Sequence, residues 1–278
     1  MAASGETATW AQERFFYRAT PSWTYKTTPQ GALSMTVHLP FDWEPDDQRP
    51  GIVFFFGGGW TGGSIEHFSR QATYLASRGM VAARADYRVL SRHGTTVEQG
   101  VEDARSAMRW LRANAGNLGL DPERLVAAGG SAGGYLAAAT ALIGEMDSPE
   151  DDLSLSAQPS ALVLFNPAFL QREDSHTTRS QVVPTQSLAE SLDLAERLCP
   201  DLPPAIMFFG DRDRWMPPGA DFCERALAMG CSVEMEVAEG EAHGFFNEGP
   251  WRKRTLHRAD QFLALLGYLS GPPTFEAP

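Results

Sequence analysis

The sequence predicts an α/β fold in which a mostly parallel central sheet of about eight strands carries helices on both faces. Three observations lead to this prediction. Short apolar runs alternate along the chain with segments in which apolar residues recur every three or four positions. Most of the apolar runs are continuous, as in strands that are covered on both sides. The composition, 43% hydrophobic and 21% charged, is that of a globular protein with a buried core.

The expected strands can be followed from the N-terminus. The first, at residues 33–39, alternates apolar and polar side chains, which predicts a strand with one buried face. The later strands are expected in apolar runs at residues 51–56, 80–85, 125–128, 161–165, 205–209 and 232–237. Helical periodicity appears between them, at residues 97–111, 135–143 and 256–266.

The chain is expected to form one domain between two tails. Its 278 residues are within the size that a single hydrophobic core can organise, and no internal repeat divides them. We assign residues 1–20 to an N-terminal tail, residues 21–270 to the domain, and the proline-rich residues 271–278 to a C-terminal tail.

Composition and charge argue against several classes of protein. The formal net charge is −12, so binding to nucleic acid or to an anionic membrane surface is not expected. No stretch approaches the roughly 20 consecutive apolar residues of a membrane span, and residues 1–9 lack the features of a signal peptide. Cys199, Cys223 and Cys231 form no C-x-x-C pair, which argues against a structural zinc site. We therefore expect a soluble protein without a metal or an organic cofactor.

The strongest chemical signal is the motif GGSAGG at residues 129–134. It directly follows the expected strand at residues 125–128 and leads into a helical run. This is the strand–turn–helix context of the G-x-S-x-G pattern, in which a serine sits on a sharp turn with its hydroxyl exposed. Glycines are needed there because side chains would collide with the neighbouring strand and helix. Ser131 is therefore a candidate nucleophile, the alternative being a helix cap in a glycine-rich turn.

A serine nucleophile needs a general base and a group that orients this base. His243 follows the last expected strand, and Asp213 follows the strand at residues 205–209. The chain order serine, aspartate, histidine is that of the α/β hydrolases. Asp211 competes with Asp213 for the orienting role. The other histidines are interpreted as solvated side chains: His38, His67, His93, His176 and His257.

A second glycine-rich loop, Gly57 to Trp60, follows the expected strand at residues 51–56. Its backbone N–H groups are candidates to bind the oxyanion of a tetrahedral intermediate, and the N–H of Ala132 is the candidate partner donor. Such a donor contributes about 3–4 kcal/mol to catalysis. A phosphate-binding loop is the alternative, but no Lys-Ser or Lys-Thr pair follows the glycines.

Taken together, these motifs resemble the α/β-hydrolase superfamily, and most closely its hormone-sensitive-lipase-like esterases and the related acetyl and feruloyl carbohydrate esterases. The resemblance extends from Thr24 to Leu269. It rests on the Gly57–Trp60 loop with the following GGS, on DYR at residues 86–88, on GGSAGG, on GDRD at residues 210–213, and on HGF at residues 243–245.

The resemblance implies a role for each matching residue. Ser131 would be the nucleophile, His243 the base and Asp213 the acid of a catalytic triad. The oxyanion donors would be the N–H groups of Gly58, Gly59 and Ala132.

The chain departs from the family pattern at Phe56, where relatives carry a histidine before the three glycines. That histidine helps to fix the loop backbone through hydrogen bonds, which a phenyl ring cannot make. Packing of residues 54–56 is the expected substitute. Arg88 with Asp103 is expected to form a buried ion pair that braces the site.

Any lid is expected to be small. The short segment before the first strand leaves no room for a large cap, and the remaining place for one is residues 166–204, with a helical run at residues 187–198. Such a lid would leave an open cleft that suits short acyl groups or bulky carbohydrate esters. Five aromatic residues near the motifs are candidates to line it: Trp60, Tyr135, Phe169, Trp215 and Phe245.

The sequence therefore predicts a serine hydrolase that cleaves carboxylic esters through an acyl-enzyme. Family analogy favours acetylated or feruloylated plant polysaccharides as natural substrates. The alternatives are an arylformamidase or peptidase-like hydrolase and a non-catalytic binding protein on the same fold. Carbohydrate-active relatives are often exported, which favours a secreted or periplasmic protein. The expected partner is a small-molecule or carbohydrate ester, and the sequence leaves the oligomeric state open.

Overall fold

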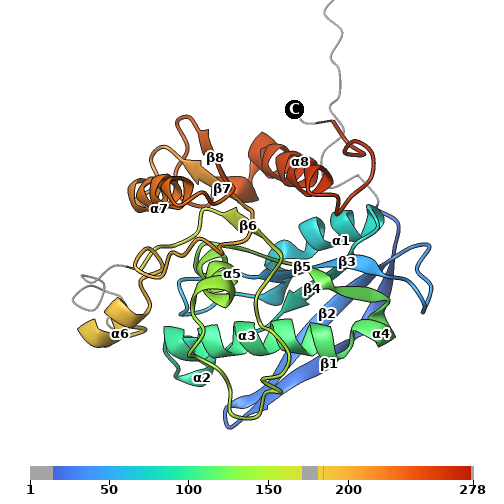
Figure 1. The fold of residues 1–278 in the computed structure, drawn as a ribbon, viewed down its shortest axis with the longest axis horizontal. Coiled ribbons are helices and arrows are strands. Elements are labelled where there is room, and N and C mark those ends of the chain that lie inside the picture. The colour runs from blue at the N-terminus through green and yellow to red at the C-terminus, as the bar shows by residue number, and fades with distance from the viewer. Residues whose placement is uncertain (1–14, 171–180, 184, 277–278) are drawn as a thin grey trace, which may run out of the picture.

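The computed structural model describes residues 15–170, 181–183 and 185–276. Eight strands form one sheet in the order β1-β2-β4-β3-β5-β6-β7-β8 (Figure 1). β2 pairs antiparallel with β1 and with β4, and every other neighbouring pair is parallel. This confirms the predicted mostly parallel sheet. The strands are β1 (Tyr17–Thr28), β2 (Gly31–Pro40), β3 (Arg49–Phe55), β4 (Val81–Ala85), β5 (Leu120–Gly130), β6 (Ala161–Phe165), β7 (Ala205–Gly210) and β8 (Val233–Ala238).

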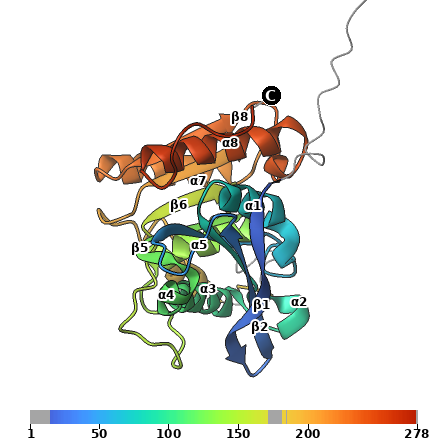
Figure 2. The same cartoon turned by 90° about the vertical axis from the view of Figure 1, so that its right-hand side faces the viewer.

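The first strand is missing from the sequence prediction. β1 begins at Tyr17, inside the segment 1–20 that the sequence assigns to a tail. It is an edge strand that forms a hairpin with β2, at one border of the sheet in Figure 2. Tyr25 is its only fully buried residue, so the strand carries too few apolar side chains to be recognised by alternation.

Helices cover both faces of the sheet, as predicted. α1 (Ser69–Ser77) and α8 (Gly249–Leu265) lie on one face, and α3 (Val97–Ala113), α5 (Ala132–Leu142) and α7 (Met216–Ala228) lie on the other. The shorter helices are α2 (Leu90–His93), α4 (Ala115–Leu118) and α6 (Gln186–Ser191), with 3-10 turns η2 (Ile65–Phe68) and η4 (Phe245–Asn247). No described helix is both long and apolar enough to cross a membrane.

The strands divide their side chains between two cores. In β3, Val53 and Phe55 enter the core beneath α3, α5 and α7, whereas Ile52 and Phe54 enter the core beneath α1 and α8. Successive residues of a strand point to opposite faces. A central strand is therefore apolar at most positions, with Arg84 of β4 as an exception, which explains the nearly continuous apolar runs that predict these strands.

The C-terminal segment is packed as far as the structure describes it, in contrast to the predicted tail at 271–278. The ring of Phe275 lies edge-on to Tyr74 of α1, with the ring centroids 4.8 Å apart. Arg78 donates a hydrogen bond to the carbonyl of Gly271 at 2.9 Å. Residues 271–276 therefore rest on the edge of the domain.

The region considered for a lid is only partly described, because residues 171–180 and 184 lie outside the described ranges. Of the predicted helical run at 187–198, only the part within α6 is helical. The chain then turns, with the carboxylate of Asp193 accepting the N–H of Ala195 at 3.0 Å. The carbonyl of Leu192 accepts the hydroxyl of Tyr135 at 2.6 Å, so this part of the segment packs onto α5.

Candidate active site

Ser131 occupies a sharp turn between β5 and α5. Its φ is 54° and its ψ is −120°, a backbone conformation that residues other than glycine rarely adopt. A Cβ at Gly129 would lie 2.3 Å from the carbonyl oxygen of Gly133, and a Cβ at Gly133 would lie 2.0 Å from that of Phe55. The glycines are therefore needed because backbone segments pass directly beside the turn, and the turn holds the hydroxyl of Ser131 at the carboxyl end of the sheet.

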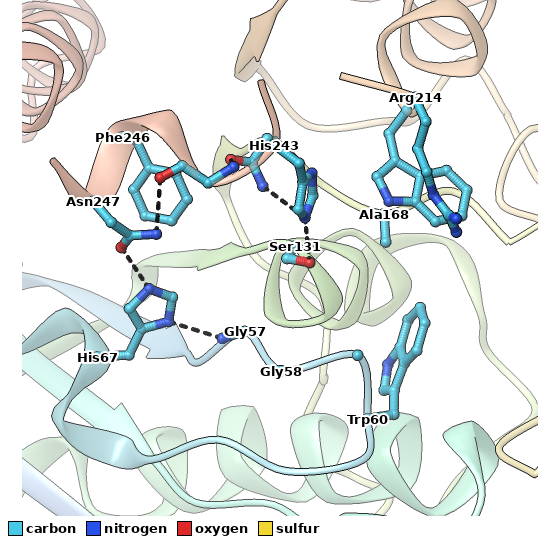
Figure 3. Close-up of a pocket in the computed structure, with 14 residues that line it drawn as sticks. Gly57, Gly58, Trp60, His67, Ser131, Ala168, Arg214, His243, Phe246 and Asn247 are labelled. Atoms are coloured by element: carbon cyan, nitrogen blue, oxygen red, sulfur yellow. Dashed lines mark hydrogen bonds between the residues drawn. The ribbon is translucent and has the colours of Figure 1, made fainter. Parts of the chain in front are cut away.

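Two further side chains, which follow β7 and β8, are linked to Ser131 by hydrogen bonds, one directly and one through the other. The Nε2 of His243 lies 2.8 Å from the Oγ of Ser131, and the Nδ1 of His243 lies 2.7 Å from the Oδ2 of Asp213 (Figure 3 shows the serine–histidine contact). The side chain of Asp213 is fully buried. Its other oxygen, Oδ1, accepts the backbone N–H of Trp215 at 2.9 Å. The structure thus brings the three predicted residues into one chain of hydrogen bonds.

The competing carboxylate has a different place. Asp211 is exposed, and its Oδ1 accepts the backbone N–H of Gly240 at 2.9 Å. It ties the end of β7 to the turn after β8. The structure therefore brings Asp213, and not Asp211, to the histidine.

Asn166 is a site residue that the sequence analysis missed. It follows β6, is fully buried, and has a positive φ of 35°. Its Oδ1 accepts the backbone N–H of Gly244 at 3.1 Å, and its Nδ2 lies 3.4 Å from the Nε2 of His243. Asn166 therefore holds the loop that carries the histidine. An asparagine directly after an expected strand, at the edge where the motifs meet, is the signal that was available.

The glycine loop after β3 lies beside Ser131. A Cβ at Gly57 would lie 3.3 Å from the Cβ of Ser131, which shows how closely the loop approaches. Gly58 has a φ of 144°, and a Cβ there would lie 2.2 Å from the carbonyl oxygen of Gly62. Within the described residues, no group accepts a hydrogen bond from the N–H of Gly58, Gly59 or Ala132. These three donors remain available to a bound substrate.

His67 holds the start of this loop, and the sequence analysis was wrong to interpret it as a solvated side chain. Its Nδ1 accepts the backbone N–H of Gly57 at 3.0 Å. With Nδ1 as acceptor, the neutral ring carries its proton on Nε2 and donates it to the Oδ1 of Asn247, 2.7 Å away (Figure 3). Burial lowers the pKa of His67, and the hydrogen bond to Asn247 partly opposes this. The ring is thereby favoured in the neutral form that can accept.

Asn247 extends this connection to the loop that carries His243. Its Nδ2 donates to the carbonyl of Gly244 at 3.1 Å. Gly244 directly follows His243, and its N–H is the group held by Asn166. His67 and Asn247 therefore tie the glycine loop to the histidine loop through side chains that are far apart in the sequence.

Phe56 anchors the other side of the glycine loop, as the sequence analysis expected of packing at this position. Its ring stacks on Tyr87 with a centroid distance of 4.1 Å, and the hydroxyl of Tyr87 donates to the carbonyl of Phe56 at 2.8 Å. Nearby, Arg88 forms the predicted buried ion pair with Asp103, its Nη2 being 2.7 Å from Oδ1. Ring packing of Phe56 and the hydrogen bond to His67 together hold a glycine loop that no histidine precedes at position 56.

A cavity of about 500 Å³ opens over Ser131. Of the predicted aromatic residues, Trp60 and Trp215 line it. Within the described ranges, no group of three or more histidine, cysteine, aspartate or glutamate side chains is placed to hold a metal ion. The lining residues are Gly57, Gly58, Gly59, Trp60, His67, Ser131, Asn166, Ala168, Arg214, Trp215, His243, Gly244, Phe246 and Asn247.

The other three predicted aromatic residues do not line this cavity. Tyr135 is buried beneath it, its ring edge-on to Trp60 at 5.4 Å. Phe169 packs against Phe222 of α7 at 5.2 Å. Phe245 points away toward Trp251, and its neighbour Phe246 lines the cavity instead. Adjacent side chains of a 3-10 turn point in different directions, so only one of the two phenylalanines can face the cavity. The sequence prediction named Phe245, and the structure places Phe246 there.

Comparisons with known proteins point to one class of enzyme. A protein-family model described as an alpha/beta hydrolase fold matches residues 52–247. Carboxylesterase NlhH from Mycobacterium tuberculosis is 29% identical over 224 residues, covering 74% of this chain and 70% of the relative. Esterase LipI from the same species is 27% identical over 233 residues, covering 78% and 72%. The native structure of esterase 2 from Thermogutta terrifontis is 40% identical, with a TM-score of 0.85 over 92% of this chain and 95% of that one.

Proposed function

The chain belongs to the α/β-hydrolase fold family and is a hydrolase of the carboxylesterase type, and from this premise we propose that it cleaves short-acyl esters with Ser131, His243 and Asp213 as its catalytic triad. The observation that carries the proposal is the chain of hydrogen bonds from the Oγ of Ser131 through His243 to the buried Asp213. This chain borders a cavity that is also lined by Gly58 and Gly59, whose N–H groups have no acceptor among the described residues.

In the first half of the reaction, the Oγ of Ser131 attacks the ester carbonyl carbon while the Nε2 of His243 takes the hydroxyl proton. The proton on Nδ1 points at Asp213, which keeps the imidazole in the tautomer whose Nε2 can accept. The carboxylate also stabilises the imidazolium that forms. His243 then gives its proton to the departing alcohol, and an acyl group remains on Ser131.

The carbonyl oxygen gains negative charge as Ser131 attacks. We assign its stabilisation to the N–H groups of Gly58, Gly59 and Ala132, with the N-terminus of α5 adding a favourable dipole. His67 is a positioning residue in this scheme, because it fixes the peptide that precedes the loop donors.

In the second half, water replaces the alcohol. His243 removes a proton from a water molecule, which attacks the acyl carbon, and the same backbone donors stabilise the second oxyanion. Return of the proton to Ser131 releases the carboxylic acid and restores the starting state.

The proposal of a short acyl group is supported by the walls of the cavity and by structures of a relative. The cavity of about 500 Å³ is lined by Trp60, Trp215 and Phe246, aromatic side chains that can enclose the apolar part of a small ester. Structures of the Thermogutta terrifontis esterase, 40% identical, have propionate or butyrate bound. Acetylated polysaccharides and feruloyl esters are the natural substrates that the sequence resemblance favours, and they form the second part of the proposal.

The proposal is tested by hydrolysis of a 4-nitrophenyl ester series from acetate to palmitate, alongside acetylated xylan and methyl ferulate. We expect turnover to be highest from acetate to butyrate and to fall for longer chains. Ser131→Ala should abolish it, and paraoxon should label the wild-type protein at Ser131 alone. A wild-type protein that hydrolyses none of these esters and is not labelled would refute the proposed function. Turnover of the small esters without release from xylan or ferulate would refute only its second part.

A further inference from the structure

One side chain with a permanent charge lines the described part of the cavity. This is Arg214, which directly follows Asp213. The other described lining residues are glycine, alanine, aromatic, amide, serine and histidine side chains. Figure 3 shows Arg214 on the same side of Ser131 as Trp60, opposite His67 and Asn247. The charge therefore belongs to one half of the cavity.

Arg214 is held in this position by Trp215. The guanidinium carbon lies 4.4 Å from the centroid of the Trp215 ring, a cation–π distance. Trp215 is itself buried, and its backbone N–H donates to Asp213. The charge is thus placed at a fixed position relative to the triad, because the same short segment carries Asp213, Arg214 and Trp215.

Unlike many other arginines of this chain, Arg214 has no acceptor for its N–H groups among the described residues. Elsewhere, arginines pair with carboxylates, as Arg78 does with Asp260 and Arg109 with Asp147. Others donate to carbonyl groups, as Arg112 does to Pro122. A guanidinium group offers five N–H donors in a planar fork that matches a carboxylate. Arg214 is exposed, so, as far as the described residues show, these donors are left for a ligand in the cavity.

We propose that Arg214 forms an anion subsite and that the enzyme prefers esters that carry a carboxylate group. The substrate class is a monoester of a short dicarboxylic acid, or an acyl ester of a hydroxy acid. This inference rests on the proposed esterase function and extends it to the substrate. The net charge of −12 repels anions in general, so a local cation is what such a substrate requires.

The test compares pairs of esters that match in shape and differ in charge. On the acyl side, mono-4-nitrophenyl succinate and glutarate are compared with 4-nitrophenyl 4-methylpentanoate and 5-methylhexanoate. On the alcohol side, 4-acetoxybenzoate is compared with 4-isopropylphenyl acetate. The two arms distinguish a carboxylate on the acid part of the ester from one on the alcohol part.

The variants are Arg214→Gln, Arg214→Lys and, as a matched control, Arg212→Gln. Arg212 is exposed and two residues away but does not line the cavity. We expect Arg214→Gln to lower kcat/KM for the preferred carboxylate ester about tenfold and to leave its neutral counterpart unchanged. Arg214→Lys should retain part of the preference, because it keeps the charge and loses the fork. Arg212→Gln should have little effect, and 0.5 M salt should weaken the wild-type preference.

The inference is overturned if the wild-type enzyme shows no preference for the charged ester in either arm, or if Arg212→Gln causes the same loss as Arg214→Gln. A binding measurement separates this result from a failure of the esterase proposal. In a Ser131→Ala background, titration calorimetry should show that monomethyl glutarate binds more tightly than dimethyl glutarate, and that Arg214→Gln removes the difference. The same measurement is made with 4-acetoxybenzoate and 4-isopropylphenyl acetate, and equal binding within both pairs would overturn the subsite even in a protein that hydrolyses no ester.

Discussion

The two sides of the cavity are built in different ways. On one side, His67 and Asn247 connect the glycine loop to the histidine loop through hydrogen bonds of 2.7 to 3.1 Å (Figure 3). On the other side, Trp60 packs edge-on to Tyr135, and the guanidinium of Arg214 lies over the ring of Trp215. Hydrogen bonds to the backbone fix the positions of donors, whereas large rings determine the shape of a cavity. Changes on the first side should therefore affect every ester, and changes on the second should affect which ester is preferred.

The largest effect is expected between the two sides, at the buried carboxylate. Asp213→Asn should lower kcat about 10⁴-fold, because an amide favours the wrong tautomer of His243. Asp211→Asn is the matched control. It removes a charge two residues away, where the side chain only caps a turn, and activity should change less than about twofold. The measurement is kcat of both variants for 4-nitrophenyl acetate in steady-state kinetics. An equal loss in both variants would contradict the assignment of Asp213.

The next largest effect is expected at His67. His67→Phe removes the acceptor of the Gly57 N–H, and kcat should fall about 10²-fold for every ester with little change in KM, as when one oxyanion donor is lost. His67→Gln can still accept from Gly57 and donate to Asn247, so it should recover much of this loss. His257→Gln, on the outer helix α8, is the control. A loss that varies with the ester, or that glutamine does not reduce, would argue against a positioning role.

A smaller effect, on selectivity, is expected at Trp215. Trp215→Leu enlarges the cavity, so the ratio of kcat/KM for octanoate to that for acetate should rise by up to about tenfold. Phe169→Leu is the matched control, because Phe169 packs against Phe222 and does not line the cavity. This variant should lower the melting temperature and leave the ratio unchanged. A change in the ratio for Phe169→Leu would place that residue in the substrate path.

Residues that directly follow a recognisable strand could be predicted from the sequence. Ser131, Asp213 and His243 each stand within a few residues of the end of a recognisable strand, and the parallel topology brings those ends together. The strands could be recognised because burial on both faces favours apolar residues at nearly every position. Local pattern was therefore enough for the fold and for the residues that form the hydrogen-bonded chain.

The supports of the site could not be predicted in this way. His67 and Asn247 are 180 positions apart, and neither lies in a motif, so only the folded chain shows that they form a hydrogen bond. The orientation of Phe245 and Phe246 depends on a single turn that periodicity does not define. Edge strand β1 was missed for a related reason, because pairing with β2 on one side requires little apolar surface.

The smallest expected effect concerns pH, and it tests whether the hydrogen-bonded side depends on a neutral His67. Burial lowers the pKa of His67 in the folded protein, so the unfolded chain, with an ordinary pKa of about 6.5, takes up the proton first as the pH falls. Folding stability should therefore decrease as the pH falls below about 6.5. His38 is also buried, so its interpretation as a solvated side chain was wrong. Burial lowers its pKa to about 4, and it contributes a second decrease of the same sign.

His67→Gln removes one of these two contributions and keeps the hydrogen bonds to Gly57 and Asn247. Urea denaturation at pH 7.5, 6.5 and 5.5 should show that the variant loses less stability than the wild type between the first and the last pH, with part of the slope remaining because His38 is still present. His257→Gln should keep the wild-type slope. An identical slope in His67→Gln would mean that the ring titrates alike in the folded and unfolded chain, and the hydrogen bond from Gly57 would then not depend on a neutral imidazole.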